Sequence, residues 1–210
     1  MQHDKVNRSF WKTFLGMSYN TYITEGIICG SFDSNTADKS YLLFTKLAGM
    51  IYASARSVRE ERSRQRFALQ DFGVVTVSLI KGKTGWRIGS VQSEGNLFSS
   101  APDRLVRGSV VRMFKFLRRF AGAEEPDLLL YNEFCRGLQH LMQANLENRP
   151  VIEEVLQARM LYHLGYIANT SDLTVILEQL LEEVLRTALP INLLSRLKTI
   201  TSNATSASHL

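Results

Sequence analysis

The residues best suited to chemistry in this chain are arginines, and they gather in one short segment. Five of them lie between positions 56 and 66, the arginine connector, where only Glu60 and Glu61 oppose them. The five are Arg56, Arg59, Arg62, Arg64 and Arg66. Guanidinium groups bind phosphate through paired hydrogen bonds and stack on bases, so the connector predicts contact with a nucleic-acid backbone. A solvated loop with internal Arg–Glu pairs is an equally good interpretation of this segment alone.

More cations, together with two aromatic rings, lie close to the connector in the sequence. Lys81 and Lys83 flank a glycine in a turn, and Arg87 follows it; we expect turn and connector to line one cleft. Tyr52 and Trp86 are candidate stacking platforms for the bases of a single strand. Either ring could instead belong to the core, and this is the stronger expectation for Trp86.

No set of residues in the sequence forms a recognisable catalytic or metal-binding group. Gly82-Lys83-Thr84 resembles the end of a phosphate-binding loop, but Val77 stands where that loop requires glycine. His140 and His163 lack the spacing of metal ligands, and no Cys-x-x-Cys pair occurs. We therefore expect no enzyme activity, no zinc site and no cofactor.

The segments that carry these residues have the pattern of β-strands. Val75, Val77 and Leu79 alternate with polar residues, and glycine or polar turns separate the neighbouring apolar runs. The expected strands cover residues 22–30, 41–45, 50–55, 74–80 and 86–91, and residues 30–35 have the composition of a loop. Five short strands predict a β-barrel of the oligonucleotide-binding (OB) type, with the connector between its third and fourth strands.

The second half of the chain has the apolar period of helices. Expected helices cover residues 102–120, with Ser100 as cap, and 126–145, 150–164, 172–189 and 192–200. The first helix has a basic face that either extends a nucleic-acid track or serves as a solvated surface. The fold class is therefore α+β, an OB barrel followed by an all-α region. We divide it into an N-terminal extension (1–20), an OB domain (21–98), a helical domain (99–200) and a disordered tail (201–210).

The charge of the chain is unevenly distributed. Residues 1–120 contain 19 basic and 9 acidic residues, a balance of +10, whereas residues 121–210 contain 6 and 11, a balance of −5. Such asymmetry indicates contact with nucleic acid or a membrane surface. Because no apolar run is long enough to span a bilayer and the two cysteines are far apart, we expect a reducing, cytoplasmic location and no membrane partner.

Three motifs occur in an order found in one known family. Residues 41–59 have the sequence YLLFTKLAGMIYASARSVR, Leu69-Gln70-Asp71-Phe72 follows, and residues 158–166 have the sequence ARMLYHLGY. They resemble the strands and basic stretch, the L-Q-P-F motif and the R-L-L-x-x-L-G-Y helix end of RecO, the bacterial recombination-mediator and DNA-repair family. The resemblance covers residues 22–166. Asp71 replaces the family's proline, and the cysteines that bind zinc in many members are absent after Tyr166.

This resemblance implies an activity and a set of partners. RecO-type mediators bind single- and double-stranded DNA and anneal complementary strands on the nucleoid. They act with RecR and single-strand-binding protein, and indirectly load the recombinase RecA. Two other functions remain open from the residues: an RNA-binding OB protein of translation or ribosome assembly, and a scaffold whose helical region binds protein partners.

Overall fold

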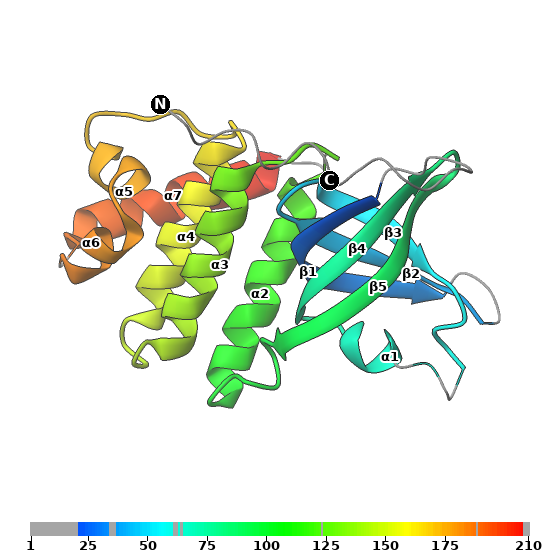
Figure 1. Cartoon of the computed structure of the whole chain (residues 1–210). Helices are drawn as coiled ribbons and strands as arrows, with labels where there is room; N and C mark the ends of the chain where they lie inside the picture. The colour runs from blue at the N-terminus through cyan, green and yellow to red at the C-terminus, as the bar shows by residue number, and fades with distance from the viewer. Residues whose placement is uncertain are drawn as a thin grey trace, which may run out of the picture.

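The computed structural model describes residues 21–33, 37–60, 63, 65–122, 124–187 and 189–207. Arg62, Arg64 and the N-terminal extension therefore lie outside the described residues. Within them, a β-barrel is followed by helices stacked on one side of it (Figure 1). The predicted fold class, a five-stranded barrel of OB type before a helical region, is confirmed.

All five expected strands are present. They are β1 (Thr21–Asp33), β2 (Lys39–Thr45), β3 (Gly49–Ala55), β4 (Gly73–Gly82) and β5 (Gly85–Asn96), with the short helix α1 (Gln65–Ala68) between β3 and β4. β1, β4 and β5 extend beyond both expected ends, whereas β2 and β3 begin earlier and end where expected. The barrel closes in the order β1-β2-β3-β5-β4. All pairs are antiparallel except β3 and β5, which run parallel and pair only at Ala53–Trp86 and Ser54–Arg87. Alternate residues of every strand fill the barrel interior.

β1 is the longest strand and belongs to both halves of the barrel. Its first part pairs with β4 and its second with β2, and Gly26 pairs with both Val75 and Thr45. The expectation of a loop from residue 30 is wrong, since β1 continues to Asp33. The register with β2 shifts at Cys29, so Phe32 pairs with Ser40. This bulge decides which side chains at the end of β1 face outward.

The helices begin close to the predicted positions. They are α2 (Arg104–Phe120), α3 (Leu128–Gln143), α4 (Arg149–His163), α5 (Thr174–Glu178), α6 (Leu181–Arg186) and α7 (Ile191–Ala207). The predicted cap Ser100 is wrong, because the carboxylate of Asp103 accepts the Val106 N–H at 2.8 Å. Asp127 caps α3 in the same way, through the Leu130 N–H at 2.9 Å. Both caps satisfy a backbone donor that the helix itself leaves free.

The single helix expected over residues 172–189 is instead two short helices, and the buried Arg159 supplies the reason. Its guanidinium donates to the carbonyl oxygens of Ile176 at 2.9 Å and Gln179 at 2.7 Å. It also pairs with both carboxylate oxygens of Glu133, at 2.7 and 2.8 Å. An arginine from α4 thus takes carbonyls at the point where α5 ends and α6 begins.

The prediction of a disordered tail is also wrong for residues 201–207, which complete α7. Thr201 is buried, and its hydroxyl donates to the Glu154 carboxylate on α4. Arg119 of α2 donates to the Thr205 carbonyl. Because α7 packs on earlier helices, its last turns are stabilised despite a sequence rich in serine and threonine.

The barrel and the helices share one hydrophobic core. Phe44 of β2 lies 5.3 Å from Tyr131 and 6.0 Å from Phe134, measured between ring centroids. Phe134 in turn contacts Phe114 of α2, which contacts Phe72 at the start of β4. In Figure 1, α2 and α3 lie beside the barrel, and α5 and α6 lie farthest from it. The helices therefore cover part of the outer face of β1, β2 and β3.

Candidate nucleic-acid interface

The uncovered part of the barrel's outer face carries two exposed aromatic rings. Phe32 of β1 is 50% exposed and Tyr52 of β3 is 61% exposed. Their ring centroids lie 6.0 Å apart with the planes tilted by 51°. We call this pair the aromatic platform. Two large rings in contact at the surface form a continuous apolar patch of the kind that marks a ligand site.

The register shows what surrounds the platform. Phe32 pairs with Ser40, Ser40 with Ser54, and Ser54 with Arg87 of β5, so these side chains form one row across four strands. Tyr52 stands beside this row on β3, opposite Leu42. The row offers rings for stacking, hydroxyls for hydrogen bonds and, at its far end, a guanidinium group. This composition suits a single-stranded polyanion.

Helices cover the other half of the same face. Cys29, Leu42, Phe44 and Met50 face outward from β1, β2 and β3 and belong to the core that the barrel shares with α2 and α3. The platform lies where this cover ends. OB barrels bind oligonucleotides on the face of their second and third strands and on the loops that follow the first and fourth strands. The uncovered half, with the β4–β5 turn, therefore corresponds to the surface that such barrels use.

One connector arginine, Arg59, lies beside the platform. Arg59 Nη1 lies 3.8 Å from Asp33 Oδ2, next to Phe32 in the sequence. The backbone N–H of Arg59 donates to Ala37, which fixes the start of the connector against the β1–β2 loop. Arg56 is exposed in the turn that follows β3. The pair with Asp33 is long and exposed, so it contributes little free energy.

A pocket opens at the end of the barrel under the connector. It has a volume of about 460 Å³, and we call it the barrel-end pocket. Its lining includes three cations, Lys39, Arg59 and Arg66, and one carboxylate, Asp71. Lys39 was not predicted from the sequence, because it lies far from the connector along the chain and only the β2–β3 pairing brings it there.

The structure does not bring Lys83 into the cleft expected for it. The residues before β4 form part of the barrel-end pocket, and the ten residues of β4 then run to Gly82 at the opposite end. Ten residues of strand span about 30 Å. Lys83 is exposed in the β4–β5 turn. In Figure 1 this turn lies at the opposite end of the barrel from α1, the helix that contains Arg66. The prediction of one cleft is therefore wrong for these two residues.

Trp86 belongs to the core, which was the stronger of the two expectations for this ring. The ring is 7% exposed and its centroid lies 5.4 Å from that of Tyr22. Its indole nitrogen donates to Glu124 Oε2 at 3.2 Å. Lys81 Nζ lies 4.8 Å from the ring centroid and 3.5 Å from the same carboxylate oxygen. Trp86 thus closes the hairpin end of the barrel and ties it to the α2–α3 loop, and Lys81 is partly neutralised there.

The basic face of α2 serves structural contacts over much of its length. Arg112 pairs with Glu153 of α4 at 2.6 Å, and Arg118 donates to the Cys29 carbonyl at 3.2 Å. Arg107 lies over the ring of Phe98, 5.6 Å from its centroid. Lys115 is exposed. Together with Arg119, which donates to the Thr205 carbonyl, four cations of the helix thus contact neighbouring segments, and the helix adds only part of its charge to the surface.

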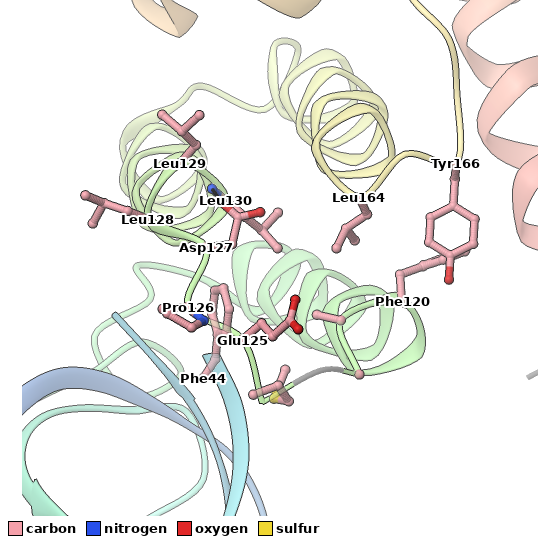
Figure 2. A pocket seen from close by; sticks show the side chains of 13 residues that line it. Phe44, Phe120, Glu125, Pro126, Asp127, Leu128, Leu129, Leu130, Leu164 and Tyr166 are labelled. Atoms are coloured by element: carbon pink, nitrogen blue, oxygen red, sulfur yellow. Dashed lines mark hydrogen bonds between the residues drawn. The ribbon is translucent and has the colours of Figure 1, made fainter. Parts of the chain in front are cut away.

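A second cavity, of about 430 Å³, lies between the barrel and the helices. Figure 2 shows the side chains of Phe44, Phe120, Leu164 and Tyr166 around it, with Glu125 among them. The second carboxylate in the lining is that of Asp127, the residue that caps α3. An apolar cavity with two carboxylates and no cation in its described lining repels a polyanion. It does not belong to the nucleic-acid interface.

The two cysteines are buried or partly buried and lie away from the platform's exposed rings. Burial raises the pKa of Cys29 to about 12 and that of Cys135 to about 11, so both thiols stay protonated near neutral pH. No three His, Cys, Asp or Glu side chains in the described ranges come together in a way that could hold a metal ion. No helix among them has the length and apolar character needed to cross a bilayer.

No protein-family model matches the sequence, and no curated protein matches it either. Function must therefore be inferred from the surface of the barrel and its chemistry.

Proposed function

We propose that this protein binds single-stranded DNA on the aromatic platform and acts as a recombination mediator of RecO type. The observation that carries the proposal is the contact between Phe32 and Tyr52, both at least half exposed, on the face that OB barrels use for oligonucleotides. Arg59 and Arg87 lie near the two ends of this site, where they can neutralise phosphates.

The chemistry of the platform favours single strands over duplexes. Stacking of a base on an aromatic side chain contributes about 1–3 kcal/mol and tolerates any sequence, because every base has a flat face. In a duplex these faces are already stacked on neighbouring base pairs. A duplex can therefore use only the cations of the surface, and its binding is the weaker and the more sensitive to salt.

The mediator role draws on the motif order described above and on the charge of the barrel. Cations along a bound strand reduce the repulsion that opposes pairing with a second strand, which supports annealing. In this role the protein acts on the nucleoid, in the cytoplasm. Its partners are single- and double-stranded DNA, single-strand-binding protein and RecR, and it loads RecA indirectly. The proposed site needs no cofactor or metal, and the proposed function is not enzymatic.

Fluorescence anisotropy with labelled 20-mers tests the binding step. We expect the dissociation constant for single-stranded DNA to be lower than that for a duplex of equal length. Tighter binding to single-stranded RNA than to DNA would favour an RNA-binding protein of translation or ribosome assembly. Absence of binding to all three at low salt would leave the scaffold as the better function.

Annealing of complementary oligonucleotides coated with single-strand-binding protein tests the mediator step. The protein is expected to accelerate pairing of the coated strands. Binding without acceleration would retain the platform as a DNA site and exclude the mediator role.

A further inference from the structure

The barrel-end pocket has a chemistry that the aromatic platform lacks. Lys39, Arg59 and Arg66 line it together with the hydroxyl-bearing residues Ser31 and Tyr41. Ammonium, guanidinium and hydroxyl groups are all donors to phosphate oxygens. Its volume of about 460 Å³ is large enough for a phosphate with its sugar.

Two cations of the pocket form long ion pairs with the same carboxylate. Lys39 and Arg59 both lie 3.8 Å from Asp33, whose side chain is 65% exposed. Exposed ion pairs of this length contribute little to the free energy of folding. Arg66 is exposed on α1, with its guanidinium over the ring of Phe67. The lining therefore presents three cations and one carboxylate, Asp71, to a dianion that enters the pocket.

The Tyr41 hydroxyl adds a neutral donor to the pocket. Tyr41 is 2% exposed as a whole residue and lines the pocket. Burial, with smaller contributions from Asp71 and Asp33, raises the pKa of Tyr41. The hydroxyl thus stays protonated and can donate to an anion. At the wall of the pocket this hydroxyl can donate to a ligand oxygen.

The pocket and the platform adjoin each other at the end of β1. Ser31 faces the pocket and Phe32 faces outward, because successive side chains of a strand point to opposite sides. Arg59 belongs to both, since it lines the pocket and reaches Asp33. Behind the pocket, Val58 and Leu69 are buried in the barrel core. A strand that crosses the platform can enter the pocket but cannot pass through it.

We propose that the barrel-end pocket binds the terminal phosphate of the DNA strand whose bases stack on the aromatic platform. The inference rests on the proposed function. A terminal phosphate carries a charge of about −1.5 to −2 near pH 7, whereas a phosphodiester within the strand carries one charge. Three cations and the Tyr41 hydroxyl therefore favour the end of a strand over its interior.

Anisotropy with 12-mers of dT that bear a 5′-phosphate, a 3′-phosphate or hydroxyls at both ends tests this inference. One of the phosphorylated forms is expected to bind about tenfold more tightly than the hydroxyl form, as one charge-assisted hydrogen bond would give. Equal affinity of all three 12-mers would overturn the inference and leave the proposed function intact. Failure of every 12-mer to bind would defeat both.

Two variants locate the phosphate, and a third controls for net charge. Tyr41→Phe removes only the hydroxyl oxygen, and Arg66→Gln removes one exposed cation; each should lower the tenfold advantage of the phosphorylated form over the hydroxyl form by several-fold. Lys198→Gln changes an exposed lysine of α7 and should leave the advantage intact. An advantage that survives both pocket variants places the phosphate elsewhere. Competition by dTMP or inorganic phosphate at concentrations below those of the 12-mer would instead identify a free-nucleotide or free-phosphate site and overturn the strand-end inference.

Discussion

Replacement of Tyr52 is the most informative change that the structure offers. Tyr52→Leu removes the ring and keeps an apolar side chain, whereas Tyr52→Phe keeps the ring. Because Tyr52 is 61% exposed, neither change opens a cavity, and the free energy of unfolding should move by no more than about 0.5 kcal/mol. Loss of one stacked base costs about 1–3 kcal/mol, so Tyr52→Leu should weaken binding of single-stranded DNA by about 5- to 150-fold.

The contact between the two rings sharpens this expectation. With centroids 6.0 Å apart, Phe32 and Tyr52 should support neighbouring bases of one strand. Residues in contact have non-additive effects, so the double variant Phe32→Leu/Tyr52→Leu should lose less binding free energy than the sum of the single variants. The difference should be at least about 0.5 kcal/mol.

Anisotropy with a dT 20-mer at several salt concentrations provides the assay. Tyr52→Leu removes no cation, so its curve of log affinity against log salt should shift without a change of slope. Tyr166→Leu is the matched control, since this tyrosine is 44% exposed and its ring packs on Phe120 among the helices. Wild-type affinity of Tyr52→Leu, or an equal loss in Tyr166→Leu, would refute the assignment of the platform.

Three further changes test other parts of the structure. Arg87→Gln should reduce the salt slope of single-strand binding by about 0.7, the value for one lost phosphate contact, and an unchanged slope would remove Arg87 from the site. Arg159→Met leaves the carboxylate of Glu133 without its partner and should lower the free energy of unfolding by about 3–5 kcal/mol in urea; a loss below 1 kcal/mol would contradict its role. Burial holds the pKa of His163 below its ordinary value in the folded chain. As the pH drops below about 6.5, the unfolded chain therefore binds a proton at His163 more readily than the folded chain, and the free energy of unfolding falls. The fall in Tm between pH 7.5 and 5.5 should therefore be smaller in His163→Leu, and an equal fall would contradict this.

The barrel could be predicted from the sequence because its signals are local. Alternation such as Val75-Thr76-Val77 marks a strand with one buried face, and glycine and lysine mark the turn that follows it. The order of five such strands before several helical segments is enough to indicate an OB barrel and an α+β fold. Each strand end was less certain, because polar residues at a sheet edge resemble a loop.

Phe32 was missed for this reason. Its neighbours Ser31, Asp33 and Ser34 have loop composition, and only the bulge at Cys29 turns Phe32 to the outer face. The signal that could have revealed Phe32 is a run of alternating exposed and buried residues into which one extra residue is inserted. Tyr52, in contrast, was predicted as a stacking residue, because it lies within a clearly apolar strand.

The features that escaped prediction all depend on contacts between distant segments. The helix over residues 172–189 breaks where Arg159, more than a dozen residues earlier, binds its carbonyls. Lys39 meets Arg59 only after β2 and β3 pair. Lys83 and Arg66 are separated by the length of β4, although the sequence places them near each other. No local pattern contains this information.

Photo-crosslinking is the measurement that tests the central claim most directly. A single-stranded oligonucleotide that carries 5-iodouracil reacts on irradiation with an aromatic ring on which the base stacks, and mass spectrometry then identifies the attached residue. Binding on the platform predicts crosslinks at Tyr52 and Phe32. Crosslinks confined to aromatic residues outside the platform, such as Phe98 or Tyr166, would contradict it.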